Sequence, residues 1–223
     1  MKPERIFIIG LILISFTSFS QTYYVKVEDR EKTINLTNQA IKLIDESKID
    51  DAVSLLIYAI SIDSTYHASY LMLYRAYLFD KQYSETAISY LMKGQRIFKE
   101  DDELSFYLGE VYRMNSDLIN AISKYSEAIS QNNINGEDSE LLYLYYVNRG
   151  TCYYKSDSLD SAISDYDSSI KIKPDYAAAF LNRGICFYKK GNSMAACADW
   201  DKAKEFGSSP AIEYIEKYCK NKK

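Results

Sequence analysis

The sequence is poor in proline and histidine. Three prolines and one histidine, His67, occur among its 223 residues. With so few prolines helices can run uninterrupted, and strand-like alternation of apolar and polar residues is confined to a short run at residues 23–27. One histidine, together with four cysteines of which none are in a CxxC pair, argues against a zinc site. These absences favour an almost wholly α-helical protein that holds no metal or other cofactor.

Motifs of the common enzyme classes are also missing from the sequence. It has no GxSxG, no HExxH and no glycine-rich phosphate loop, and the acidic run at residues 157–167 lacks the glycine of a calcium loop. We interpret those aspartates as a helix cap and a solvent-exposed face. His67 falls where a helix should begin, and we expect it to be exposed or to cap that helix. We therefore expect no catalytic activity.

Residues 1–20 have the composition of an export signal. Lys2 and Arg5 precede an uncharged, mostly apolar run at 6–19, and Ser18 and Ser20 are small residues at the positions that a signal peptidase reads. As a helix the run would rise about 21 Å, which is less than the ~30 Å hydrocarbon core of a bilayer. We expect cleavage after Ser20, no stable membrane insertion afterwards, and a periplasmic or extracellular protein; the alternative is a retained membrane anchor.

The rest of the chain is mildly acidic. Loss of Lys2, Glu4 and Arg5 changes the formal net charge from −4 to about −5. No basic run follows. The charge argues against nucleic acid or anionic lipid headgroups as partners.

One pattern is written twice in the second half of the chain, 34 residues apart. Asn148-Arg149-Gly150 recurs as Asn182-Arg183-Gly184, and Ala162 recurs as Ala196. An alanine of the same kind, early in every second helix, can be followed back through the chain at Ala121, Ala87 and Ala52. Small residues at these positions allow two antiparallel helices to approach closely, and bulky neighbours such as Tyr146 and Tyr166 fill the space beside them.

This period and these positions resemble the tetratricopeptide repeat, in which each unit is a pair of helices. The resemblance implies an all-α, right-handed solenoid of about five helical hairpins with a C-terminal capping helix. It places a lead-in at 21–32, repeats at 33–66, 67–101, 102–135, 143–176 and 177–208, an insertion at 136–142, and the capping helix and tail at 209–223. The insertion is expected either to extend the following helix backwards, with Ser139 as its cap, or to form a loop. The capping helix should cover the last repeat with Ala211, Ile212, Ile215, Tyr218 and Cys219.

In this family the first helices of the hairpins line a concave groove that holds a partner segment. The resemblance assigns to that groove, besides Glu103, the residues Phe106, Glu110, Arg113, Leu144, Val147, Thr151, Tyr154, Lys155, Leu181, Ile185, Tyr188 and Lys189. The family's carboxylate clamp needs lysine and asparagine where Val147 and Thr151 stand, so that activity is not implied. Asn148 and Asn182 match a position that we interpret as structural.

The four cysteines would permit three connectivities if all of them paired. Cys152 and Cys186 hold the same place in neighbouring repeats, where helices are usually ~8 to 10 Å apart, beyond the reach of a disulfide. The capping helix should lie against the helix that carries Cys197. A Cys197–Cys219 disulfide is therefore predicted, and similar ends occur in exported bacterial proteins of this family.

The leading functional hypothesis is a non-catalytic, exported adaptor that binds a protein or peptide segment. Two alternatives stay open, a structural module that self-assembles through its ends and an envelope protein that binds a small ligand or glycan. A closed terminal helix predicts a monomer or a modest dimer rather than filaments.

Overall fold

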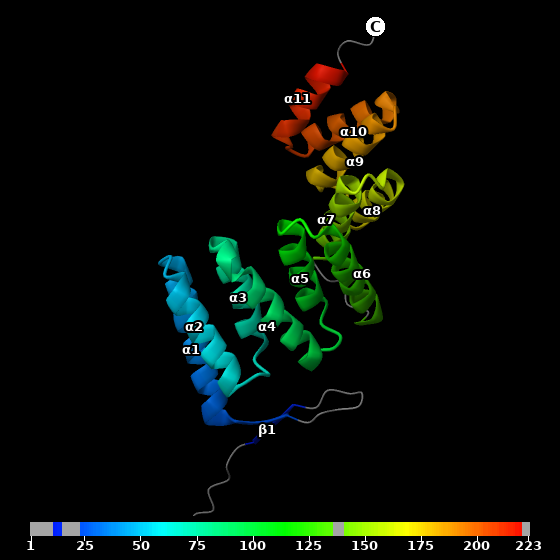
Figure 1. Ribbon diagram of the computed structural model, residues 1–223. Coiled ribbons are helices and arrows are strands. Elements are labelled where there is room, and N and C mark those ends of the chain that lie inside the picture. Colours follow the sequence, from blue (N-terminus) through cyan, green and yellow to red (C-terminus); the bar gives the residue numbers. More distant parts are fainter. Residues whose placement is uncertain (1–10, 15–22, 136–140, 220–223) are drawn as a thin grey trace, which may run out of the picture. The chain divides into compact units, whose positions relative to one another are not determined.

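The computed structural model describes residues 11–14, 23–135 and 141–219. The chain divides into two compact units, which we call unit 1 (Met1–Lys99) and unit 2 (Glu100–Lys223). In each unit the helices pair into hairpins, so the fold is the all-α solenoid that the repeats predict (Figure 1).

Unit 1 contains two helical hairpins preceded by a short two-stranded ladder. Its elements are β1 (Leu11–Ile14), β2 (Tyr23–Lys26), α1 (Val27–Asp45), α2 (Ile49–Ile62), α3 (His67–Phe79), the 3-10 turn η1 (Lys81–Tyr83) and α4 (Ser84–Ile97). His67 is the first residue of α3; it is half-buried and packs edge-on against Phe98, with ring centroids 5.2 Å apart.

Strand β1 lies inside the segment that we expect to be removed. Its residues pair antiparallel with β2, with Leu11 opposite Lys26 and Ile14 opposite Tyr23. The sequence reading had left residues 1–20 out of the fold. Residues 1–10 and 15–22, with the expected cleavage site at Ser20, lie outside the described residues. Cleavage there would remove the partner of β2, and it stays a prediction.

The first hairpin begins earlier than the repeat pattern indicates. Helix α1 begins at Val27, within the expected lead-in, and two acidic residues in its first turn suit the positive end of the helix dipole. Arg30, also in the lead-in, places its Nε 2.5 Å from Oδ2 of the buried Asp63 and donates through Nη2 to the hydroxyl of Thr65 at 2.7 Å. The lead-in is thus part of the packing of the first hairpin.

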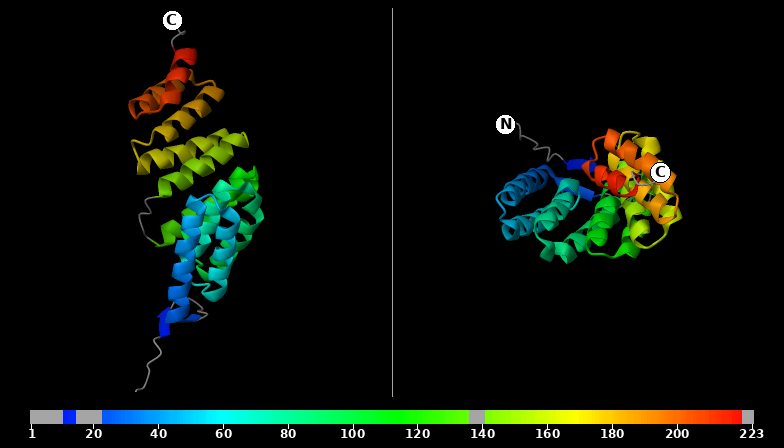
Figure 2. Two further views of the ribbon diagram at one scale, coloured as in Figure 1. Left: turned by 90° about the vertical axis from the view of Figure 1, so that its left-hand side faces the viewer. Right: turned by 90° about the horizontal axis from the view of Figure 1, so that it is seen from above.

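Unit 2 contains three hairpins and a closing helix. Its elements are α5 (Asp102–Met114), α6 (Leu118–Asn135), α7 (Leu142–Lys155), α8 (Leu159–Ile172), α9 (Ala177–Lys189), α10 (Ser193–Glu205) and α11 (Ser209–Tyr218). Figure 2 shows the α7–α8 and α9–α10 hairpins and α11 layered in chain order.

The helix before the insertion is longer than the second helices of the later hairpins. Helix α6 has 18 residues, whereas the second helices α8 and α10 have 14 and 13. Helix α7 begins at Leu142, one residue before the expected start of its repeat, and the expected cap Ser139 lies outside the described residues. The insertion residues 136–140 lie outside the described residues.

Each hairpin of unit 2 is closed by a glycine against a ring. A Cβ added at Gly184 would lie 2.6 Å from Nε1 of Trp200, and one at Gly109 would lie 2.7 Å from the ring of Tyr125. Such distances are far inside van der Waals contact, so these positions exclude a side chain.

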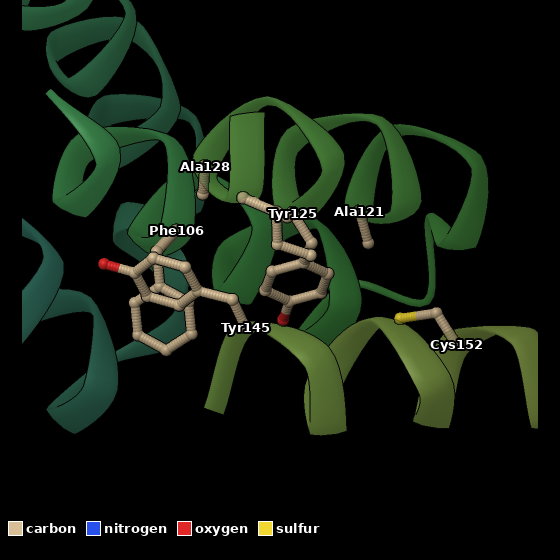
Figure 3. Close-up of a cluster of buried hydrophobic side chains, with 7 residues drawn as sticks. Phe106, Ala121, Tyr125, Ala128, Tyr145 and Cys152 are labelled. Atoms are coloured by element: carbon tan, nitrogen blue, oxygen red, sulfur yellow. The ribbon is translucent and has the colours of Figure 1, made fainter. Parts of the chain in front are cut away.

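A cluster of buried side chains joins the first two hairpins of unit 2. Figure 3 shows the rings of Phe106 and Tyr145 facing each other, and their centroids lie 4.8 Å apart. Tyr125 of α6 lies beside them, and Cys152 of α7 belongs to the same cluster. The contacts hold α5, α6 and α7 together.

Candidate functional site

The first helices of the unit 2 hairpins are α5, α7 and α9, and the closing helix α11 continues the series. We call the surface that they share the first-helix face. The residues that the family resemblance assigns to a groove lie on α5, α7 and α9. The structure separates them into buried, half-buried and exposed side chains, and only part of the set is available to a partner.

Two of the predicted groove residues are core residues instead. Phe106 is 6% exposed and packs against Tyr145 and Tyr125. Val147 is 5% exposed and belongs to the next core cluster, with Tyr166. Their assignment to the groove was wrong because each fills the gap between its own hairpin and the following one.

Two of the charged groove residues of α5, Glu110 and Arg113, form an ion pair with each other. Glu110 is buried and accepts hydrogen bonds from Arg113 Nε at 3.1 Å, from Arg113 Nη2 at 2.8 Å, from Asn148 Nδ2 at 2.9 Å and from the hydroxyl of Tyr125. Hydrogen bonding to Glu110 raises the pKa of Arg113, and burial, with Glu110 nearby, raises the pKa of Tyr125. This network ties α5 to α6 and α7, so Glu110 is not a groove contact, and Asn148 is structural as expected.

The middle of the first-helix face is only half-buried. Leu144, Leu181 and Ile185 retain some exposure, and Thr151 donates its hydroxyl to the carbonyl of Val147 at 2.8 Å. Together they form an apolar surface with few polar groups of its own.

The exposed part of the face lies toward the ends of α7 and α9. Lys155, Tyr188 and Lys189 are exposed and Tyr154 is half-buried. The ammonium of Lys189 lies 4.8 Å from the ring centroid of Tyr154 and 3.2 Å from Oδ1 of Asp157. A cation held over a ring in this way gains about 0.5 to 1 kcal/mol at an exposed site.

The closing helix adds aromatic residues that the sequence reading did not place on this face. Tyr218 packs its ring 4.4 Å from that of Tyr188. Tyr214 lies 5.0 Å from the buried Trp200, whereas Ile212, which was expected to cover the last repeat, is 42% exposed.

We call Tyr154, Tyr188 and Tyr218 the tyrosine row, with one member on each of three successive helices of the series. The first two are 34 residues apart and the third follows after only 30. The repeat period therefore does not point to Tyr218.

Two buried ion pairs, also missed from the sequence, recur in the last two hairpins. Arg149 donates two hydrogen bonds to Asp165, at 2.9 and 2.7 Å, and a third to Ser126 of the preceding second helix. Arg183 repeats the arrangement with Asp199, at 2.8 and 2.7 Å, and contacts the preceding second helix at Asp167. The sequence contains a signal for these ion pairs, because the two arginines are 34 residues apart and so are the two aspartates.

Part of the acidic run is therefore not the solvated face that we expected. Asp165 is 4% exposed, and burial raises the pKa of its carboxyl while Arg149 opposes the rise. Asp157 and Asp160 are exposed and pair with Lys189 and Lys190.

The cysteines divide into a bonded and an unbonded pair. Cys197 and Cys219 form a disulfide with α-carbons 5.8 Å apart, which joins α11 to α10. Cys152 and Cys186 are buried thiols, and burial raises the pKa of each to about 11. They act as small core residues that are not ionised near neutral pH.

The part of the chain that the structure describes has neither a metal-binding cluster nor a membrane-spanning helix. No group of three or more histidine, cysteine, aspartate or glutamate side chains there is arranged to hold a metal ion. None of the helices described combines the length and apolarity needed to cross a membrane.

Comparison with known proteins gives the fold a family context. Residues 150–191 match the model of the tetratricopeptide repeat. A crystal structure of MamA is similar with a TM-score of 0.67 and 24% identity, covering 85% of this chain and 97% of that one. YrrB, described as a tetratricopeptide repeat protein with an unusual peptide-binding site, has a TM-score of 0.64 and 22% identity over 85% of this chain and 94% of its own.

A third similar structure is PilF of Pseudomonas aeruginosa, with a TM-score of 0.70, 13% identity and 86% of each chain covered. No curated protein sequence matches the chain. At these identities the likeness shows the fold alone, which is an all-α solenoid of tetratricopeptide type.

Proposed function

We propose that the protein is a non-catalytic, exported scaffold that binds a segment of a partner protein on the first-helix face of unit 2. The observation that carries the proposal is the tyrosine row. Tyr188 is 38% exposed although the core beneath it is already filled by Trp200, which is fully buried. A solenoid buries its core between repeats, so packing of the core does not explain large rings that stay at the surface. Tyrosine is also frequent at binding hot spots.

The chemistry of the face indicates the kind of segment that would bind. The half-buried Leu144, Leu181 and Ile185 suit apolar side chains, and the rings of the tyrosine row suit flat or apolar groups. Lys155 and Lys189 on the exposed edge favour acidic residues beside those anchors. For a face of modest area we expect an affinity of roughly micromolar. The peptide-binding site named for YrrB is consistent with this use of the fold.

Two double variants test the proposal. Tyr154→Ala with Tyr188→Ala should weaken partner binding by about 1 to 3 kcal/mol, the usual loss for central aromatic anchors. Lys155→Glu with Lys189→Glu leaves the rings in place and should also weaken binding, because it repels an acidic segment. The measurement is affinity capture from cell-envelope extract with quantitative mass spectrometry, followed by titration of each captured protein with purified variants.

The matched control is Lys171→Glu with Lys204→Glu, which makes the same charge change at exposed positions on the second helices α8 and α10. A partner of the first-helix face is retained by this control and lost from both test variants. Because Tyr188 also packs against Tyr218, far-UV circular dichroism and the melting temperature must accompany each titration. Unchanged capture by folded test variants would refute the proposed face.

Export is the second part of the proposal. It is supported by the composition of residues 1–20 and by the Cys197–Cys219 disulfide, since disulfides persist in oxidising compartments. Intact mass of the protein from the periplasm or medium should correspond to a chain that begins at Gln21 and holds one disulfide. Retention of Met1 in a membrane fraction would overturn both the cleavage and the location.

The outer side of α11 is the surface on which a second copy would stack if the protein assembled through its ends. Glu213, Glu216 and Lys217 are exposed there, and exposed charges oppose stacking of a second copy. We expect a monomer or modest dimer by light scattering.

A further inference from the structure

Unit 1 has a hollow on the side of its second helices. The hollow has a volume of about 400 Å³ and is lined from α2 and α4, with Tyr70 of α3 and Ser64 of the connecting turn. Its apolar part is formed by Ile57, Ile60 and Ile97. A volume of this size is within the range of pockets that bind ligands.

The helix α4 side of the hollow carries two cations and no anion. Lys93 and Arg96 both line it, are exposed, and are three residues apart on one helix face. The ammonium of Lys93 lies 4.1 Å from the ring centroid of Tyr90, which also lines the hollow.

No carboxylate lines the hollow, and neither Lys93 nor Arg96 forms an ion pair with the residues at 11–14, 23–135 or 141–219. Like charges at this helical spacing repel each other slightly. An anionic group bound between them would remove that repulsion and gain two charge-assisted contacts.

The lining of the hollow covers about two turns of α4. On α4 its lining extends from Tyr90 to Ile97, which corresponds to about 10 Å of helix. About three residues of extended chain cover the same distance. The isoleucines beside the cations would accept an apolar side chain from the same segment.

We propose that this hollow is a second binding site, for a short acidic peptide segment that carries a carboxylate side chain next to an apolar one. Arg96 and Lys93 bind the carboxylate, and Ile57, Ile60 and Ile97 take the apolar side chain. The site belongs to the second helices of unit 1, whereas the first-helix face belongs to unit 2. The chain would then hold two segments, which is what a scaffold requires and goes beyond the function proposed above.

Fluorescence anisotropy of a labelled peptide tests this site. The probe is an acetylated, fluorescein-labelled hexapeptide with two glutamates between a phenylalanine and an isoleucine, and its match has glutamines in place of the glutamates. The glutamate peptide should bind the full-length mature protein about tenfold more tightly than the glutamine peptide, because only the former pairs with the two cations. Added salt should reduce this difference.

Variants then identify where on the protein the labelled peptide binds. Lys93→Ala with Arg96→Ala should weaken binding of the glutamate peptide about tenfold, and both positions are exposed, so the fold should be kept. The control Lys42→Ala with Lys171→Ala removes the same charge from exposed helix positions elsewhere and should leave binding unchanged. In the unit 2 variant Lys155→Glu with Lys189→Glu, which weakens any binding of the probe to the first-helix face, the tenfold preference for the glutamate peptide should remain, and this separates the two sites.

Four results would overturn the inference. They are absence of binding of the glutamate peptide up to millimolar concentration, equal binding of the two peptides, no effect of the Lys93→Ala, Arg96→Ala variant, and loss of binding in the unit 2 variant. Displacement of the peptide by inorganic phosphate at a concentration equal to that of unlabelled peptide would mean a small-anion site instead. Loss of binding in the unit 2 variant would place the peptide on the first-helix face, whereas the other outcomes do not bear on partner capture by that face.

Discussion

Unit 1 and unit 2 close similar hairpins with different chemistry. Each first helix of the unit 2 hairpins carries a glycine against a ring of the second helix, whereas α1 and α3 of unit 1 contain no glycine. In unit 1 the hydroxyl of Thr33 on α1 donates to the carbonyl of Ala59 on α2 at 3.3 Å, and between the two hairpins the hydroxyl of Thr37 on α1 lies 2.8 Å from that of Ser69 on α3. The repeat architecture requires a close approach of helices. A glycine against a ring provides it in unit 2, and hydroxyl contacts accompany it in unit 1.

Both units also bury an arginine–aspartate pair, but its place differs. In unit 2 the pair joins the two helices of one hairpin and occurs twice in the same register, at Arg149–Asp165 and Arg183–Asp199. In unit 1 Arg30, which precedes the expected first repeat, reaches Asp63 at the end of α2. The pair of unit 2 is a property of the repeat, whereas that of unit 1 is specific to the end of the solenoid.

The largest expected effect comes from breaking one of these pairs. Arg149→Met leaves Asp165 buried without its cation, and we expect a loss of about 3 to 5 kcal/mol in the free energy of unfolding, measured by urea denaturation. A carboxyl whose pKa in the folded protein lies above the ordinary 3.8 costs stability when ionised, so the loss should shrink as the pH falls through that pKa. Arg30→Met should cost a similar amount in unit 1.

Hydrogen exchange followed by mass spectrometry tells the two variants apart. Arg149→Met should increase exchange in unit 2, and Arg30→Met in unit 1, because repeat contacts are local. The control Arg149→Met with Asp165→Leu removes both charges and should recover most of the loss. An equal increase of exchange across both units in either variant would contradict the expectation that each ion pair stabilises only its own unit.

A smaller effect is expected from the glycine of the last hairpin. Gly184→Ala would normally gain about 1 kcal/mol in a helix, but here the new methyl group meets the buried Trp200 at 2.6 Å. Overpacking of this kind usually costs about 1 to 3 kcal/mol, so the thermal midpoint should fall.

The matched test in unit 1 is Ala40→Gly on α1, where Ala40 is fully buried. That change should destabilise by about 1 kcal/mol through helix propensity. Glycine is thus required at position 184 in unit 2 and unfavourable at position 40 in unit 1. A rise of the thermal midpoint in Gly184→Ala would show that Trp200 can move aside.

Features written more than once in the sequence could be predicted from it. The hairpins and the glycine positions of the last two repeats followed from the 34-residue period, because a feature that occurs in two copies is more than a chance pattern. The Cys197–Cys219 pairing followed from the same register, which kept Cys152 and Cys186 apart.

Features that occur once, or that depend on a neighbouring hairpin, could not be predicted in this way. Arg30 has no second copy, and Tyr218 follows the preceding tyrosine at a shorter interval. The repeat period also predicts which helix face Phe106 and Val147 occupy. It does not predict whether the next hairpin covers them. Phe106 is covered because Tyr145, at the start of α7, packs against it after the insertion.

An effect of about the same size is expected at the hydroxyl contact between α1 and α3. Thr37 and Ser69 are both buried, and Thr37 also donates to the carbonyl of Thr33 at 2.9 Å. Thr37→Val keeps the shape but leaves the Ser69 hydroxyl without this partner, which should cost about 1 to 2 kcal/mol in urea denaturation. Thr37→Val with Ser69→Ala removes both polar groups and should cost less than the sum of the single changes, with a coupling of about 1 kcal/mol. If the two changes add without coupling, the hydroxyls do not hold these helices together, and apolar packing alone holds α1 against α3.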